Sequence, residues 1–147
     1  MSQLNDLNIR QSFYQWLTTT TLVDDFKTGN PDQFDPNKAD TQEWVFVKVK
    51  KCNRKKHSKP GQEHYDLLIE SEVKSRDQSA TLGAASMVAK VTEALAVNLV
   101  IPVYDYSESG DPQVGTIRLL ESESKEGDSR VWHTIMVSTS AVAQNLE

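Results

Sequence analysis

The chain has 147 residues, enough for one domain with a single core and too few for two. Its 16 Lys and Arg against 21 Asp and Glu give a formal net charge of −5, which argues against a protein that coats duplex nucleic acid. The single cysteine, Cys52, excludes an intrachain disulfide and a Cys-rich zinc site, and no apolar run is long enough to span a bilayer. We expect a soluble intracellular domain whose polar N-terminus is not a signal peptide.

The first predicted element is a helix. Apolar residues recur at spacings of three and four from Leu7, and β-branched Thr18–Thr21 favour an end near Leu17. Asn5, Asp6, or Asn8 with Gln11 are its candidate caps. Residues 24–41 follow, with five aspartates and two prolines, and we interpret them as a loop.

A change of period at Trp44 predicts two strands. Val45, Val47 and Val49 share one face, with Trp44, Phe46, Lys48 and Lys50 on the other, and a second alternating run extends from Tyr65 to Val73. A polar connection joins the two runs. The pattern predicts a long antiparallel hairpin whose basic tip, residues 50–61, projects from the sheet.

The remaining chain predicts a second helix and three more strands. The Ala-rich segment 80–97 has helical periodicity and forms the helix. Turn-rich segments at 107–112 and 122–128 separate the strands, and residues 141–147 are interpreted as a C-terminal tail. Pro102 cannot donate a ladder hydrogen bond, so its run is an edge or irregular strand. The three runs are Leu99–Tyr106, Val114–Glu121 and Arg130–Thr139.

The predicted order is therefore α-β-β-α-β-β-β. This order predicts a single α+β domain over residues 1–147, with a mainly antiparallel sheet and both helices packed on one face.

The sequence offers little support for catalysis or metal binding. His57, His64 and His133 lack metal-ligand spacing, and neither a nucleophile elbow nor a phosphate-binding glycine loop occurs. A thiol enzyme using Cys52 beside its basic neighbours, or a hydrolase using His133, is a remote alternative. Glu70 and Glu72 on one strand face are better explained as a solvated face. We expect no catalytic residue, cofactor or metal, and a protein that is not an enzyme.

The charge of the chain is divided unevenly. Residues 48–59 hold seven basic residues and no acid, which leaves nine basic against twenty-one acidic residues, or −12, elsewhere. Three interpretations remain open: a phosphate clamp, a solubilising tip, and a segment that docks on the acidic surface of an adjacent subunit. We favour docking, because the segment has no aromatic residue on which a base could stack. The candidate subunit-contact residues are Trp44, Phe46, Lys48, Lys50, Lys51, Arg54, Lys55, Lys56 and Lys59.

Four features together resemble the tail terminator, or tail completion, proteins of long-tailed bacteriophages. They are the N-terminal helix, the hairpin whose second strand ends in LLIESEVKSRD, the Ala-rich helix directly after it, and the strands VGTIRLLES and VWHTIMVSTS. The resemblance covers roughly residues 5–140.

The resemblance implies a virion structural protein without catalysis. Such a protein assembles as a ring, hexameric in this family, that caps the tail tube and joins it to the head-side connector or neck protein. It is located in the virion tail or neck after assembly in the host cytoplasm. DNA would pass through the bore without specific binding, and no membrane is involved. Another ring-forming neck or tail component, or a nucleic-acid-binding module using the basic hairpin, is the alternative.

Overall fold

The computed structural model describes residues 4–19, 43–55, 62–75, 81–127 and 133–145. The predicted loop at 24–41 and residues 56–61 of the predicted tip lie outside these ranges. The observed order confirms the predicted α-β-β-α-β-β-β arrangement. The elements are α1 (Asp6–Leu17), β1 (Glu43–Arg54), β2 (His64–Ser75), α3 (Thr81–Ala94), β3 (Val100–Tyr104), β4 (Gln113–Gly127) and β5 (His133–Asn145).

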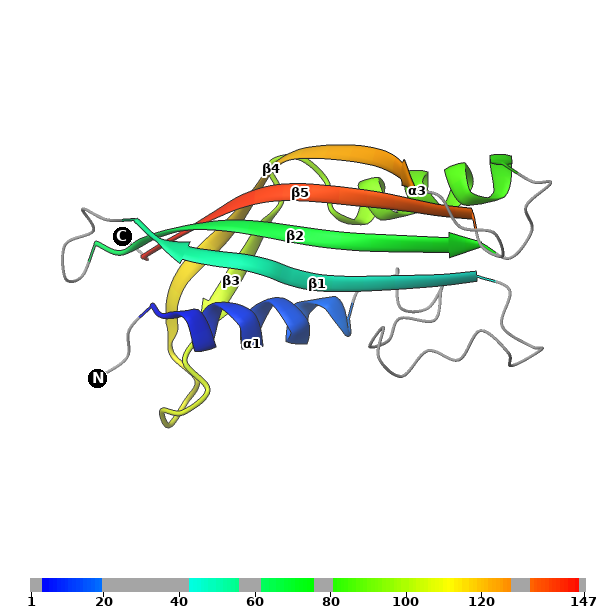
Figure 1. The fold of residues 1–147 in the computed structure, drawn as a ribbon. Helices are drawn as coiled ribbons and strands as arrows, with labels where there is room; N and C mark the ends of the chain where they lie inside the picture. The colour runs from blue at the N-terminus through cyan, green and yellow to red at the C-terminus, as the bar shows by residue number, and fades with distance from the viewer. Residues whose placement is uncertain (1–3, 20–42, 56–61, 76–80, 128–132, 146–147) are drawn as a thin grey trace.

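The strands form one antiparallel sheet in the order β1-β2-β5-β4-β3 (Figure 1). The C-terminal strand β5 is therefore central, and β1 and β3 are the two outermost strands. Pro102 lies in β3, as expected for a residue that cannot donate to a neighbouring strand on both sides.

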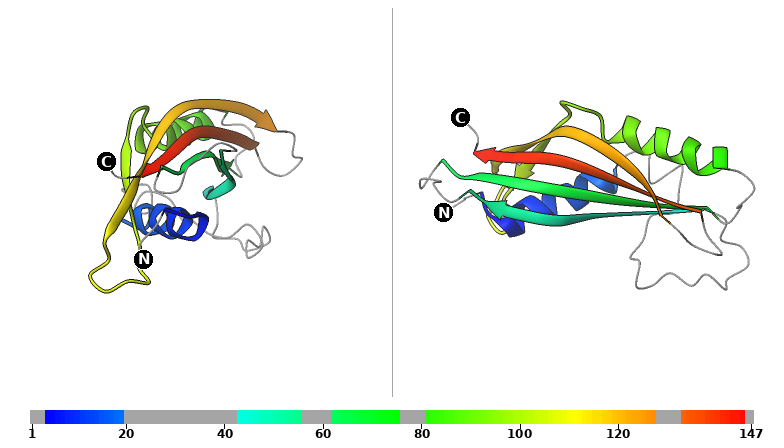
Figure 2. Two further views of the ribbon diagram at one scale, coloured as in Figure 1. Left: turned by 90° about the vertical axis from the view of Figure 1, so that its left-hand side faces the viewer. Right: turned by 45° about the horizontal axis from the view of Figure 1, so that its top comes forward.

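The apolar core lies on one face of the sheet. Alternate residues of β2, from Tyr65 to Val73, are buried on this face. Ile9 and Phe13 of α1 and Val91 of α3 belong to the same buried cluster, so both helices cover the same face, as predicted. The sheet curves around that face, with α1 across its open side (Figure 2).

Helix α1 begins and ends where local chemistry favours it. Asn5 is the cap, and its side chain accepts a hydrogen bond from the Asn8 N–H at 2.8 Å. The helix ends at Leu17, and the Thr18 hydroxyl then donates to the Gln15 carbonyl at 2.7 Å. The predicted end at Leu17 is confirmed.

Strand β1 extends further than predicted. It continues to Arg54, so residues 50–54 belong to the strand, and 51–54 are paired with β2, rather than forming part of a projecting tip. The register shifts between Val49 and Lys51, where one extra residue resets the alternation. The second part of the strand was not predicted, because the shift interrupts the alternation of apolar and polar residues at that point.

Strands β4 and β5 are also longer than predicted. Residues 122–127, expected to be a turn, are paired with β5 after a second register shift between Leu119 and Ser122. Residues 141–145, expected to be a tail, belong to β5, where Ala141 and Ala143 are buried in the core. Glutamate, lysine, glycine and alanine are depleted in strands, so tertiary pairing determines these segments.

Candidate interaction surface

Helix α1 ties together the main chains of the two outermost strands. The Arg10 guanidinium donates to the Val49 carbonyl of β1 at 2.9 Å, and the Val49 N–H donates to the Tyr14 hydroxyl at 3.0 Å. The buried Ser12 hydroxyl accepts from the Tyr104 N–H of β3 at 2.8 Å. These contacts occupy one position on each outermost strand, which makes that position unavailable to another chain.

An ion pair supports the arginine of this tie. Asp6, one turn earlier on α1, forms a salt bridge and a hydrogen bond with Arg10. The contact with Asp6 raises the pKa of the guanidinium, against the lowering effect of burial. The pair therefore holds a permanent cation against the β1 main chain.

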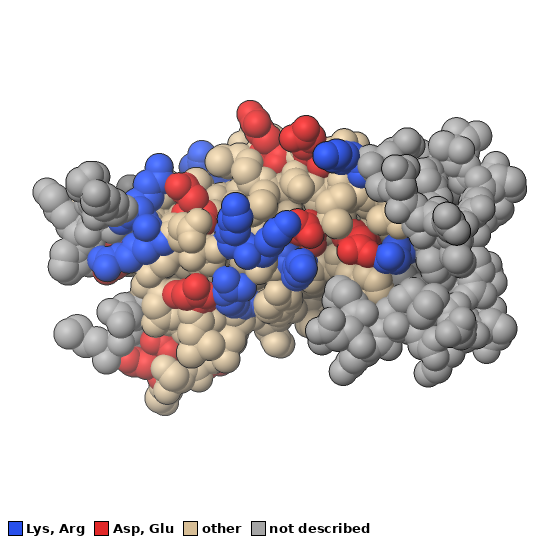
Figure 3. Space-filling model, in the orientation of Figure 1, with Lys and Arg blue, Asp and Glu red and all other residues tan. Residues whose placement is uncertain are grey.

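The described cations of the basic segment are exposed along β1 and at the residue that follows it. Lys48 and Lys51 lie opposite Glu70 and Leu68 on the face away from the core. Figure 3 shows Lys and Arg gathered over β1 and β2. The exposed cations are Lys48, Lys50, Lys51, Arg54 and Lys55.

Carboxylates of β2 neutralise part of this surface. Lys50 Nζ lies 2.8 Å from Glu70 Oε2, and Lys55 Nζ lies 3.6 Å from Asp66 Oδ2. Within the described residues, Lys48, Lys51 and Arg54 form no ion pair. We call Lys48 and Lys51, which share the outer face of β1, the basic β1 surface.

The other predicted contact residues differ in their placement. Phe46 is only 2% exposed, so its side chain is not presented on the surface of the single chain. Trp44 is the second residue of β1 and lies opposite Lys74 of β2, but its side chain is not among those described. Lys56 and Lys59 lie outside the described residues.

The environment of Cys52 opposes nucleophilic activation. The residue lies opposite Leu67 in the register and packs half-buried against the core. Burial raises the pKa of the Cys52 thiol to about 11, and Asp6 adds to the rise while Arg10 opposes it. A nucleophilic cysteine needs the opposite shift. The basic neighbours in the sequence therefore do not activate this thiol.

The remaining candidate chemistry does not converge. Glu70 and Glu72 each pair with a lysine, Glu72 with Lys74 at 3.1 Å. His64 Nε2 lies 3.8 Å from Asp66 Oδ1, and the side chain of His133 is not described. No group of three or more His, Cys, Asp or Glu suited to a metal ion occurs among the described residues.

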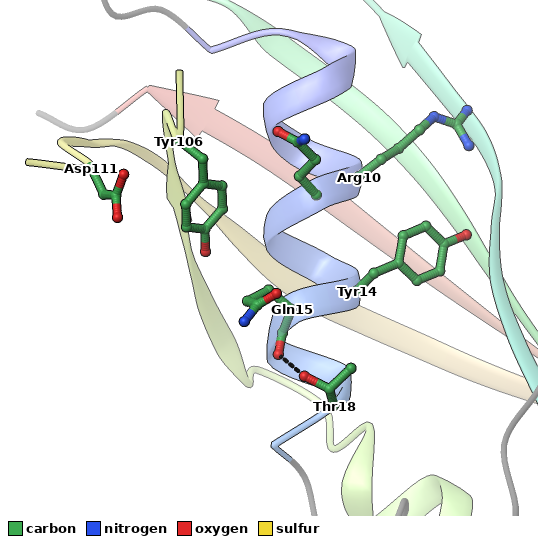
Figure 4. A pocket seen from close by; sticks show the side chains of 7 residues that line it. Arg10, Tyr14, Gln15, Thr18, Tyr106 and Asp111 are labelled. Atoms are coloured by element: carbon green, nitrogen blue, oxygen red, sulfur yellow. Dashed lines mark hydrogen bonds between the residues drawn. The ribbon is translucent and has the colours of Figure 1, made fainter. Parts of the chain in front are cut away.

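A surface hollow of about 660 Å³ lies between α1 and the β3–β4 loop. Arg10 and Tyr14 point from α1 toward β1, whereas Tyr106 and Asp111 lie on the other side of the helix (Figure 4). A ligand site needs a few convergent polar groups. These side chains diverge, so the hollow has no defined ligand chemistry.

A second charged segment, in the second half of β4, was not predicted as a strand because it was expected to be a turn. Residues 121–125 of β4 are all exposed and include Glu121, Glu123 and Lys125. Acidic side chains lie along the top of the view in Figure 3, over β4. The alternation of Glu and Ser in ESES was the available signal for a strand with two polar faces.

No protein-family model matches this chain, and no curated protein matches it with significance. In the part of the chain that the structure describes, no helix is both long and apolar enough to cross a bilayer.

Proposed function

We propose that this chain is a tail terminator: a non-enzymatic virion protein that forms a homo-oligomeric ring of six copies. The ring caps the tail tube and joins it to the head-side connector. The observation that carries the proposal is the basic β1 surface, two exposed cations that form no ion pair with the described residues, in a chain whose remaining charge is acidic. The resemblance in element order to the tail terminator family supports it.

The physical argument concerns how copies of one chain associate. A contact between two different surfaces of the same protein is head-to-tail, and such contacts close into rings when the rotation between copies permits. Complementary charge sets the register and the choice of partner at such a contact. Lys48 and Lys51 provide one surface, and the acidic remainder of the chain supplies the other.

A nucleic-acid-binding module is the second candidate, because the same exposed cations suit phosphate groups. The β2 carboxylates favour the ring instead. Asp66 and Glu70 lie among the cations and already pair with Lys55 and Lys50, and they would repel a polyanion. The net charge of −5 adds to that repulsion.

Sedimentation of the purified chain, alone and with tail-tube protein, tests the ring. We expect a discrete oligomer, which the double variant Lys48→Glu/Lys51→Glu disrupts while the far-UV circular dichroism stays unchanged. The matched control is Arg118→Glu, which reverses an exposed cation on β4. A chain that stays monomeric with and without the tube protein contradicts the proposal.

Binding to duplex DNA at low salt separates the two candidates. The ring proposal predicts no binding above that of the Lys48→Glu/Lys51→Glu variant. Tight binding that weakens steeply with salt and is lost in that variant would establish the nucleic-acid module instead.

A further inference from the structure

The second half of β4 forms a strand edge that is open on one side. Strand β3 pairs with β4 only as far as Arg118, and the main chain of Leu119 is bonded to Asn98 and Leu99. Beyond this point residues 121–125 are exposed, and β4 pairs with β5 alone. No other described segment pairs with this stretch, so its outward main-chain groups are a template for a further strand.

The register gives the direction of those main-chain groups. The N–H and C=O of Val49 bond to side chains of α1 and therefore point away from β2. Main-chain groups alternate in direction along a strand, so those of the neighbouring Lys48 point toward β2 and exchange hydrogen bonds with Glu70. Glu70 lies opposite Ser138 of β5, and Ser138 lies opposite Glu123. Alternation across the four strands therefore directs the main-chain groups of Glu123 toward β5.

The residues on either side of Glu123 consequently point outward. The N–H and C=O of Ser122 and Ser124 face away from β5, on the open edge. An incoming antiparallel strand would bond to these two residues.

The charges of this edge are self-complementary. In an antiparallel pair of two β4 edges centred on Ser124, Glu123 of each chain lies opposite Lys125 of the other. Both residues lie on the outer face, in register with Ser138 and Met136 of β5, and neither has an ion pair among the described residues. Opposite charges directly across two strands stabilise the pair, and like charges destabilise it.

We propose that residues 121–127 of β4 pair antiparallel with the same residues of a second copy of this chain. The contact is twofold symmetric, joins two sheets into one, and contains two Glu123–Lys125 ion pairs. Of the four long strands, β1 and β4 are the outer two, so this contact lies toward the opposite edge of the sheet from Lys48 and Lys51. It is therefore separate from the proposed ring contact and does not depend on it.

A charge exchange within one chain tests this contact. The twofold contact places Glu123 of each chain opposite Lys125 of the other, so a single substitution creates two pairs of like charges. Glu123→Lys and Lys125→Glu should therefore each weaken the dimer about tenfold or more in sedimentation equilibrium. The double variant Glu123→Lys/Lys125→Glu should restore dissociation to near the starting value. The matched control, Glu93→Lys on the exposed surface of α3, should leave it unchanged.

A main-chain variant provides an independent measurement. Ser124→Pro removes an N–H that no described strand of the same chain uses, and proline is accepted at such edge positions. We expect a chain with unchanged circular dichroism and no dimer. A Ser124→Pro chain that is folded and still dimeric overturns the proposal, and the charge-exchange variants remain decisive if this chain does not fold.

Three results count against the β4 contact. The first is a wild-type chain whose only oligomers are abolished by Lys48→Glu/Lys51→Glu. The second is a double charge exchange that fails to restore the dimer, in which case Glu123 and Lys125 serve to keep edges apart. The third is rescue of Glu123→Lys by Lys48→Glu/Lys51→Glu, which would assign β4 to a head-to-tail contact with the basic β1 surface.

Discussion

At the scale of single residues, Cys52 is a sensitive probe of the fold. Burial raises the pKa of its thiol from 9.0 to about 11, so at pH 8 the thiolate fraction is about a hundredfold lower than in an unfolded chain. We expect iodoacetamide to alkylate the folded chain about a hundredfold more slowly than the chain in urea. Mass spectrometry of the alkylated protein over time measures both rates. Equal rates would contradict the buried thiol.

The same shift fixes the sign of a pH dependence. Because the pKa is raised on folding, the contribution of Cys52 to stability is complete below pH 9 and is lost as the pH rises toward 11. Urea unfolding of the wild type and Cys52→Ala at both ends of this range isolates the contribution from other titrating groups. A difference between the two chains that does not change with pH would refute the linkage.

Single residues also mark the limit of alternation as a guide. The pattern from Val45 to Val49 correctly assigned the core face of β1 and placed Lys48 on the other face. It also placed Phe46 with the exposed contact residues, whereas Phe46 is buried on the face opposite the core. A period of two shows which residues share a face of a strand. It does not show whether other segments of the same protein cover that face.

At the scale of elements, side chains of α1 form hydrogen bonds with the main chain of β1 that could not be predicted from the sequence. The Tyr14 hydroxyl accepts a hydrogen bond from the Val49 N–H, although the residue is 38% exposed. Tyr14→Phe should therefore destabilise the chain by about 1 kcal/mol, by leaving a strand N–H without its acceptor. Urea unfolding measures the change. Tyr106→Phe is the matched control, because Tyr106 is equally exposed and its hydroxyl accepts no N–H from the described strands. Equal losses in both variants would contradict the proposed role of the Tyr14 hydroxyl.

The elements themselves were predicted correctly in kind and order, and the misplaced boundaries share a cause. The ends of β1, β4 and β5 lie in Lys-rich, Ser/Glu-rich and Ala-rich sequence, where local propensity gives no strand signal. Their neighbours determine them: Ala143 pairs with Tyr65 on one side and Ile117 on the other. Two register shifts further interrupt the alternation at Val49 and Leu119. By contrast, the end of α1 at Leu17 was predictable because it depends on local chemistry.

At the scale of the whole molecule, the charge is distributed by strand. The sequence alone showed a basic segment in an acidic chain. In the structure its cations from Lys48 to Arg54 lie along β1, beside β2 carboxylates. The open edge of β4 became visible only with the register, because it requires knowing that β3 stops opposite Arg118. The two surfaces lie at opposite margins of the four long strands. Two distinct contacts between copies are therefore geometrically compatible.

Salt should separate these two contacts. The proposed ring contact relies on exposed charges, whose interactions are screened as the Debye length falls from about 10 Å at 0.1 M salt to about 3 Å at 1 M. The proposed β4 contact keeps its main-chain hydrogen bonds when its two ion pairs are screened. We expect sedimentation in increasing NaCl to show loss of the larger oligomer first, with a dimer persisting that Ser124→Pro abolishes. The core is apolar, so thermal unfolding should change little over the same range. A larger oligomer that strengthens with salt would instead indicate an apolar contact, and would remove Lys48 and Lys51 from the assembly.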